Sequence, residues 1–169
     1  HTWGVRGVSI DVRAGEILGV AGLVGSGKSR VWRGALGLLK LNAGRVSVKG
    51  HDLTGAPTRK LLREGIFYLP PDRKNEGLQM IATAQENILL SLLERKDIIG
   101  TYGLLSLRKG RTLCYEIAQR VDIPSIYMKR AVVNLSGGNQ QKVLFGKGFG
   151  RERDIYIFDE PTVGVDMGT

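Results

Sequence analysis

A glycine-rich loop between an apolar run and a helical stretch constrains this chain more than any other feature. The loop reads Gly22-Leu23-Val24-Gly25-Ser26-Gly27-Lys28-Ser29 and matches every specified position of the phosphate-loop pattern. Before it, the short apolar run 17–21 is typical of a strand buried on both faces, and after it the sequence predicts a helix from about Ser29 to Leu39. Strand, loop and helix in this order predict an α/β fold built around a phosphate site.

The residue types of the loop indicate how it binds phosphate. Glycines let backbone N–H groups converge on phosphate oxygens, and a helix N-terminus adds about half a positive charge. We expect all eight residues to contact the nucleotide, with Lys28 reaching the β/γ-phosphates and assisting catalysis and Ser29 ligating Mg²⁺. ATP and Mg²⁺ are therefore the expected cofactors. The alternative is a glycine-rich turn that contains Lys-Ser by chance.

A second apolar strand, predicted over 155–158, ends in two carboxylates, Asp159 and Glu160. Ligands gather at the carboxyl ends of strands in open α/β sheets. Together with a phosphate loop, Asp159 is expected to support Mg²⁺ and Glu160 to activate water as a general base. The alternative is a pair of solvated charges at a strand end.

A third motif, Leu135-Ser136-Gly137-Gly138, precedes a helix predicted over 140–149. A hydroxyl and two glycines before a helix make a second anion-binding start. Because one chain with one phosphate loop has no internal need for it, the motif indicates a nucleotide held mainly by another domain. The alternative is an ordinary serine-capped helix.

The rest of the chain predicts alternating strands and a helical section. Strands are expected over 8–12, 45–49 and 66–69, the first and second from period-two alternation. Thr83 and Glu86 form a capping box that predicts the start of one helix. A second helix is expected from about Leu107 to Val121, with Cys114 as a packed thiol. Residues 80–130 are thus mostly helical between flanking strands.

Composition excludes several classes. The 169 residues suit one domain, and the net charge of +9 is carried by scattered basic pairs, so no nucleic-acid partner is expected. No apolar stretch approaches the roughly 20 residues of a membrane span, and we expect neither a membrane span nor an export leader.

The loop, the Leu-Ser-Gly-Gly signature and Asp-Glu-Pro-Thr occur in the order found in ABC ATPases, which the chain resembles over essentially its whole length. The segments 68–78 and 139–142 are similar to the second ATPase half of ribose- and xylose-type sugar importers. The resemblance implies a RecA-like P-loop core with an antiparallel β piece and an inserted helical subdomain, truncated at both ends. Its expected segments are a core over 1–79, a helical part over 80–135, and the signature helix, Walker B strand and D-loop over 136–169.

The resemblance also implies partners. Two ATPase domains of this family close head to tail, so that Ser136, Gly137 and Gly138 act on the partner's nucleotide and Gly164-Val165-Asp166 forms the D-loop. The pair drives a membrane permease, indirectly serves a sugar-binding protein, and lies at the cytoplasmic face of the inner membrane. The alternatives are a soluble ABC ATPase that acts on nucleic acid or ribosomes, and a regulatory half that binds ATP without hydrolysing it.

Departures from the family pattern concern coupling more than binding. Pro71 stands about where such domains carry a glutamine that touches Mg²⁺, and proline offers neither an acceptor side chain nor an N–H. Coupling through this loop is therefore expected to differ, with Asp72 as one candidate and the role left unassigned. Val163 replaces an arginine usual in the sugar group. Trp3 is a candidate for adenine stacking or for simple packing, and neither His1 nor His51 fits the family's switch histidine.

Replacing Lys28 by alanine provides the first test of the phosphate loop. Lys28→Ala removes the ammonium expected at the β/γ-phosphates, and we expect nucleotide binding to be lost. Equilibrium binding of MgATP measures the effect, and an unchanged affinity would contradict the assignment.

Overall fold

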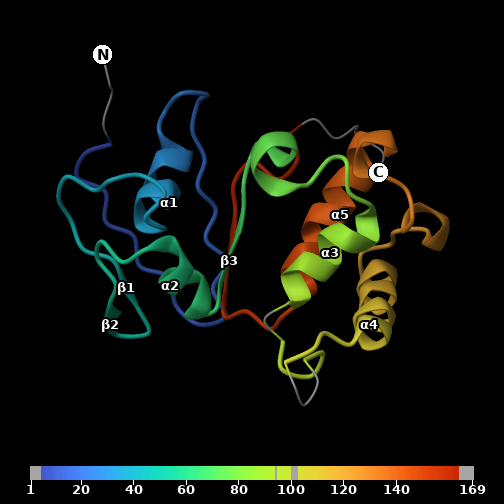
Figure 1. The fold of residues 1–169 in the computed structure, drawn as a ribbon. Coiled ribbons are helices and arrows are strands. Elements are labelled where there is room, and N and C mark those ends of the chain that lie inside the picture. The colour runs from blue at the N-terminus through green and yellow to red at the C-terminus, as the bar shows by residue number, and fades with distance from the viewer. Residues whose placement is uncertain (1–4, 94, 100–102, 164–169) are drawn as a thin grey trace. The chain divides into compact units, whose positions relative to one another are not determined.

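A computed structural model of the chain describes residues 5–93, 95–99 and 103–163. The chain divides into two compact units, residues 1–64 and 65–169. The first contains α1 (Lys28–Ala35), β1 (Ser47–Val48), β2 (His51–Asp52) and α2 (Thr58–Arg63). The second contains β3 (Ile66–Leu69), the π-helical turn η1 (Arg73–Gly77), α3 (Ala84–Leu92), α4 (Leu107–Arg120), the 3-10 turns η2 (Ser125–Tyr127) and η3 (Val132–Asn134), α5 (Gly137–Phe149) and β4 (Ile155–Phe158) (Figure 1).

In the first unit, α1 is shorter than the sequence predicts. It begins after Gly27 and ends at Ala35, not at Leu39. Gly37 adopts φ 68°, and the amides of Leu38 and Leu39 both donate to the Arg33 carbonyl, at 2.8 and 3.0 Å. The left-handed glycine therefore turns the chain off the helix axis before the apolar pattern ends.

The β piece of the first unit is a two-stranded antiparallel hairpin. Ser47 pairs with Asp52 and Val48 with His51, across a two-residue loop in which Lys49 and Gly50 have φ 51° and 82°. Two positive φ values are the requirement of the tight turn that matches strand twist. The antiparallel piece predicted near 45–49 is confirmed, although its strand covers only two of those residues.

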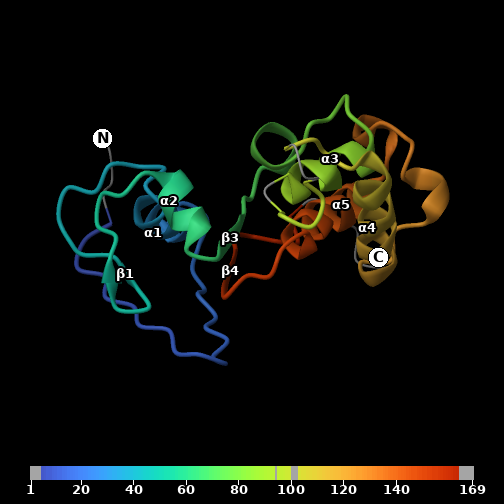
Figure 2. The same ribbon diagram turned by 60° about the horizontal axis from the view of Figure 1, so that its bottom comes forward.

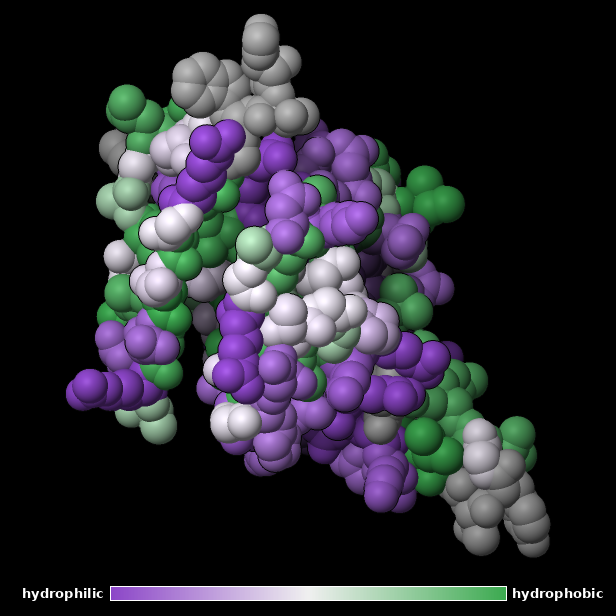
Figure 3. Space-filling model, turned by 90° about the vertical axis from the view of Figure 1, so that its left-hand side faces the viewer, coloured by the Kyte–Doolittle hydropathy of each residue, from purple (hydrophilic) through white to green (hydrophobic). Residues whose placement is uncertain are grey.

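The strands predicted over 8–12 and 17–21 are absent, which corrects the expectation of a strand before the phosphate loop. A strand exists through its hydrogen-bonded neighbour. Within the described ranges the paired strands are β1 with β2 and β3 with β4, and neither pair includes these runs. Ile17 is accordingly 99% exposed. Apolar and polar side chains are interspersed on the face drawn in Figure 3.

The second unit depends on a parallel strand pair that the sequence predicted as two separate strands. β3 pairs with β4 from Ile66↔Ile155 to Leu69↔Phe158, so residues far apart in the sequence lie side by side (Figure 2). A parallel pair needs a long crossover connection. Residues 70–154 supply it, and they contain the helices of the unit.

Helices α3, α4 and α5 enclose the core of this unit. Ile88, Cys114 and Val143, one from each helix, are all fully buried. Burial raises the pKa of the Cys114 thiol to about 11, and its Sγ lies 3.6 Å from the Gln85 carbonyl oxygen, as expected for a packed thiol. The amphipathic helix predicted near 107–121 is confirmed as α4.

Side-chain caps fix where the helices of the second unit begin. The Thr83 hydroxyl accepts from the Glu86 amide at 3.2 Å, and the Glu86 carboxylate accepts from the Thr83 amide at 2.8 Å. The Ser106 and Ser136 side chains cap α4 and α5 by accepting from the Lys109 and Asn139 amides. The predicted capping box and the serine at the start of α5 are therefore both present.

The capping box predicts a measurable stability change with pH. Thr83→Ala should lower the free energy of unfolding by about 1 kcal/mol at neutral pH. Hydrogen bonds from Thr83 hold the pKa of Glu86 below its ordinary 4.5, so the carboxylate's contribution is present above that pH. The backbone amide of residue 83 still donates to Glu86 in the alanine variant, so only the part of the difference that the Thr83 hydroxyl contributes by donating to the carboxylate should be lost as the pH falls through the lowered pKa, as measured by urea unfolding.

Thr112→Ala is the matched control. Thr112 lies inside α4 and donates to the Arg108 carbonyl at 3.2 Å, so the same change there should cost less than about 0.5 kcal/mol. Equal effects of the two substitutions would contradict the cap assignment.

Candidate functional site

The phosphate loop in the first unit has the backbone that its glycines predict. Gly25 and Gly27 have φ 83° and 95°, in the left-handed region that favours glycine. A Cβ on Gly22 would stand 2.9 Å from the Ser26 Oγ, so the loop also closes tightly across its base. Gly27 leads directly into Lys28 and Ser29, the first residues of α1. The loop therefore opens onto a helix N-terminus, which favours an anion.

The Lys28 ammonium lies over this loop. Its Nζ donates to the Gly22 carbonyl at 2.6 Å and to the Leu23 carbonyl at 3.4 Å. The side chain therefore folds back from α1 and brings the positive charge to the same loop as the helix N-terminus. The donor chemistry of the loop, an ammonium with a Ser29 hydroxyl beside it in sequence, fits a magnesium–nucleotide phosphate.

The carboxylates of the second unit follow β4 as predicted, and they differ in environment. Asp159 is only 3% exposed; its amide donates to the Leu69 carbonyl at 3.0 Å, and its Oδ2 accepts from the Tyr68 hydroxyl at 2.9 Å. Glu160 is half-buried and has φ 48°, an uncommon conformation for a residue with a side chain. The amide of Val163 donates to the Glu160 carbonyl at 3.2 Å and closes a turn. Asp159 is thus fixed by hydrogen bonds to β3, whereas Glu160 begins a turn with a strained backbone.

The signature residues form the first turn of α5. The Ser136 Oγ accepts from the Asn139 amide at 3.3 Å and from the Asn139 Nδ2 at 2.9 Å. Gly137 and Gly138 follow, and Gly138 is buried. This geometry suits both an anion-binding start and an ordinary serine cap, so the assignment of Ser136 to a nucleotide stays a prediction.

Sequence reasoning missed a polar network that joins these elements. Arg73, at the start of η1, donates from Nε to the Gln140 Oε1 at 3.3 Å and from Nη1 to the Val163 carbonyl at 2.7 Å. The hydrogen bond of Tyr68 to Asp159 was also missed. Tyr68, Arg73 and Gln140 lie in the segments 68–78 and 139–142, which resemble the sugar-importer family, but the resemblance gave these residues no role.

The structure describes the surroundings of two positions where the sequence departs from the family pattern, Pro71 with its neighbour Asp72, and Val163. The Asp72 carboxylate accepts from the Lys74 and Asn75 amides and from the Asn75 Nδ2 at 2.7 Å, which lowers the pKa of Asp72, the Asn75 side chain contributing most. Asp72 therefore caps η1. At Val163, which replaces an arginine usual in the family resemblance, the backbone carbonyl accepts from the Arg73 guanidinium at 2.7 Å. Trp3, His1 and Gly164-Val165-Asp166 lie outside the described residues.

The predicted site residues fall into two groups. Gly22 to Ser29 lie in the first unit, and Ser136 to Gly138 with Asp159 and Glu160 lie in the second. In the described ranges, no three His, Cys, Asp or Glu side chains gather as a metal cluster, and no helix has the length and apolarity to cross a bilayer.

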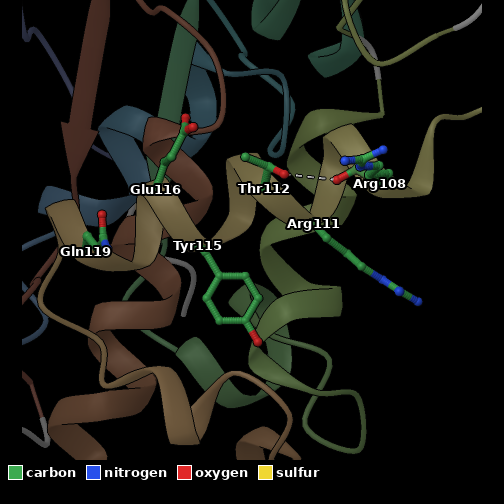
Figure 4. A pocket seen from close by; sticks show the side chains of 6 residues that line it. All are labelled: Arg108, Arg111, Thr112, Tyr115, Glu116 and Gln119. Carbon is green, nitrogen blue, oxygen red and sulfur yellow. Dashed lines mark hydrogen bonds between the residues drawn. The ribbon is translucent and has the colours of Figure 1, made fainter.

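A hollow along α4 is separate from these groups. Its walls are side chains of that helix, shown in Figure 4: Arg108, Arg111, Thr112, Tyr115, Glu116 and Gln119. None of them is a predicted nucleotide residue, so the hollow does not bear on the phosphate chemistry.

Solved structures define the class of this fold. A dimeric ATP-binding cassette in a post-hydrolysis state, bound to ADP and Pi, matches with a TM-score of 0.77 at 23% identity, over 94% of this chain and 66% of that one. CbiO1 from Clostridium perfringens, part of the ABC transporter complex CbiONQ, matches with a TM-score of 0.73, over 95% of this chain and 60% of that one. The predicted α/β P-loop fold is therefore confirmed as that of an ATP-binding cassette.

The family model of the ABC transporter matches residues 5–163, and the chain belongs to this family. It is similar to the ribose import ATP-binding protein RbsA of Lactococcus lactis subsp. lactis, at 39% identity over 96% of this chain and 32% of the relative. It is also similar to RbsA of Yersinia pestis, at 39% identity over 97% of this chain and 32% of the relative. The chain thus spans about a third of the length of these relatives.

The Tyr68 hydrogen bond to Asp159 predicts a stability change. Tyr68→Phe leaves the buried carboxylate without this donor, and the free energy of unfolding at neutral pH should fall by about 1.5 kcal/mol. Tyr156→Phe is the control on the paired strand, where the tyrosine is 39% exposed and the expected change is within about 0.5 kcal/mol. Equal urea-unfolding curves for wild type and Tyr68→Phe would contradict the role of this bond.

Proposed function

We propose that this chain is part of an ATP-hydrolysing subunit that powers import of a sugar or a related small polar solute through a membrane permease. The observation that carries the proposal is the 39% identity to ribose import ATP-binding proteins across 96% of the chain, including the phosphate loop and the carboxylate strand end. Family membership supports ATP binding, and the relatives' names support import.

In this proposal the phosphate loop holds the nucleotide. Gly22 to Ser29 surround the phosphates with backbone N–H groups, and Lys28 exchanges its loop carbonyls for phosphate oxygens. Ser29 and Asp159 are the residues that would hold a magnesium ion, and the ion would neutralise charge on the phosphates. Tyr68 keeps the Asp159 carboxylate oriented through the 2.9 Å hydrogen bond.

Glu160 acts as the general base on the attacking water. Its left-handed backbone aims the side chain from a turn that follows the strand, while Asp159 stays anchored beside Leu69. Two adjacent carboxylates thereby take different tasks, because one is buried and hydrogen-bonded and the other begins a strained turn.

In this proposal a second ATPase domain pairs with this one to form the functional dimer. Ser136, Gly137 and Gly138 contact the nucleotide of that partner, and closure of the pair on ATP drives the permease. A sugar-binding protein delivers the solute, and the subunit lies peripherally at the cytoplasmic face of the inner membrane. The dimeric state of a structural neighbour supports the pairing.

Glu160→Gln tests the proposed catalysis in the full-length protein. The amide keeps the size of the side chain and cannot take a proton, so MgATP binding should persist while turnover falls by about 100-fold or more. Binding and phosphate release are measured on the same preparation.

Glu152→Gln is the matched control, an exposed glutamate before β4 that should leave turnover unchanged. Normal hydrolysis in Glu160→Gln would remove Glu160 from its role. Binding without hydrolysis in the wild type would favour the alternative of a regulatory half, to which the proline at position 71 also points.

A further inference from the structure

Arg73 connects two elements that carry different parts of the proposed chemistry. Its guanidinium donates to Gln140 on α5 and to the carbonyl of Val163, partners 67 and 90 residues away in sequence. Both acceptors are neutral, so these contacts set position and do not neutralise charge. A planar guanidinium with several fixed donors suits such a bridge better than an ammonium does.

The backbone beneath Arg73 is held firmly. Asp72 caps the turn from one side, and the Leu78 amide closes it by donating to the Arg73 carbonyl at 2.8 Å. At the far end of η1, the Lys147 ammonium of α5 donates to the Gly77 carbonyl at 2.5 Å. η1 is therefore attached to α5 at both ends, and Arg73 extends from a fixed base.

Gln140 is oriented by its own hydrogen bonds. Its Nε2 donates to the carbonyls of Val132 and Leu135, each at 3.1 Å, and the side chain is 5% exposed. A flipped amide would place its oxygen against two carbonyl oxygens, so the oxygen must face Arg73. Gln140 lies one helical turn after Ser136, whose carbonyl accepts from the Gln140 amide at 2.9 Å.

The other end of the bridge is the turn of Glu160. The Val163 carbonyl that accepts from Arg73 belongs to the residue whose amide closes this turn onto the Glu160 carbonyl. The signature helix and the catalytic turn are thus three hydrogen-bonded steps apart, through Gln140, Arg73 and Val163.

We propose that Arg73 is a positioning residue that locks the signature helix to the Glu160 turn. The inference rests on the proposed function, in which Ser136 serves the partner's nucleotide and Glu160 serves the chain's own. Arg73 then makes the geometry of one ATP site depend on the other. Because this role acts through Gln140 and the Glu160 turn and not through a nucleotide contact, loss of Arg73 should lower kcat and leave the KM for ATP unchanged.

Kinetics of the full-length protein test the coupling. Arg73→Ala and Arg73→Lys should each lower kcat by about tenfold and leave KM within about twofold of wild type. Lysine keeps the positive charge, but it lacks the forked guanidinium donors that reach both acceptors. Lys74→Ala, which removes a neighbouring exposed charge from η1, should match the wild type. In a double-mutant cycle, Gln140→Ala should add little to Arg73→Ala.

Hydrogen exchange supplies a readout that does not need turnover. The Val163 amide should exchange about tenfold faster in Arg73→Ala than in wild type or Lys74→Ala, because the turn has lost its anchor. Unchanged exchange, an unchanged kcat, a KM effect alone, or additive loss with Gln140→Ala would each overturn the inference. Failure of the proposed function appears separately, as a wild type without ATP turnover or a Glu160→Gln variant with normal turnover.

Discussion

The parallel pairing of β3 with β4 is the contact on which the second unit depends. It joins residues 66–69 to residues 155–158 and closes a loop that contains the helices of the unit. Closing so long a loop costs conformational entropy, and the buried faces of α3, α4 and α5 offset that cost. Gly148 is part of this arrangement, since a Cβ there would stand 2.8 Å from the Phe67 ring on β3.

Functional positions follow from this pairing. Asp159 emerges from β4 beside Leu69 and Tyr68 of β3, so one strand supplies the carboxylate and its neighbour the hydrogen-bond donor. Immediately after β3, η1 brings Arg73 to α5 and to Val163. The strand pair therefore sets the distance between the signature helix and the carboxylates, and local caps at Asp72 and Ser136 refine it.

Sequence patterns predicted the elements whose signals are local. The capping box at Thr83, the amphipathic α4 and the apolar β4 carry their periodicity or cap chemistry within a few residues, and each is present. The runs 8–12 and 17–21 failed because a strand needs a partner that its own residues do not specify. The hydrogen bonds from Tyr68 to Asp159 and from Arg73 to Gln140 and Val163 were unpredictable for a related reason, since each joins residues more than 60 positions apart. Only the family resemblance of their segments marked them in advance.

Purification of the full-length protein from detergent-solubilised membranes tests the central claim most directly. The account predicts that a polytopic permease comes with it and that adding the transported solute with its binding protein stimulates ATP hydrolysis by the complex. A protein that instead remained soluble and co-purified with nucleic acid or ribosomes would contradict the import function. That result would leave the proposal of MgATP binding by the phosphate loop unaffected.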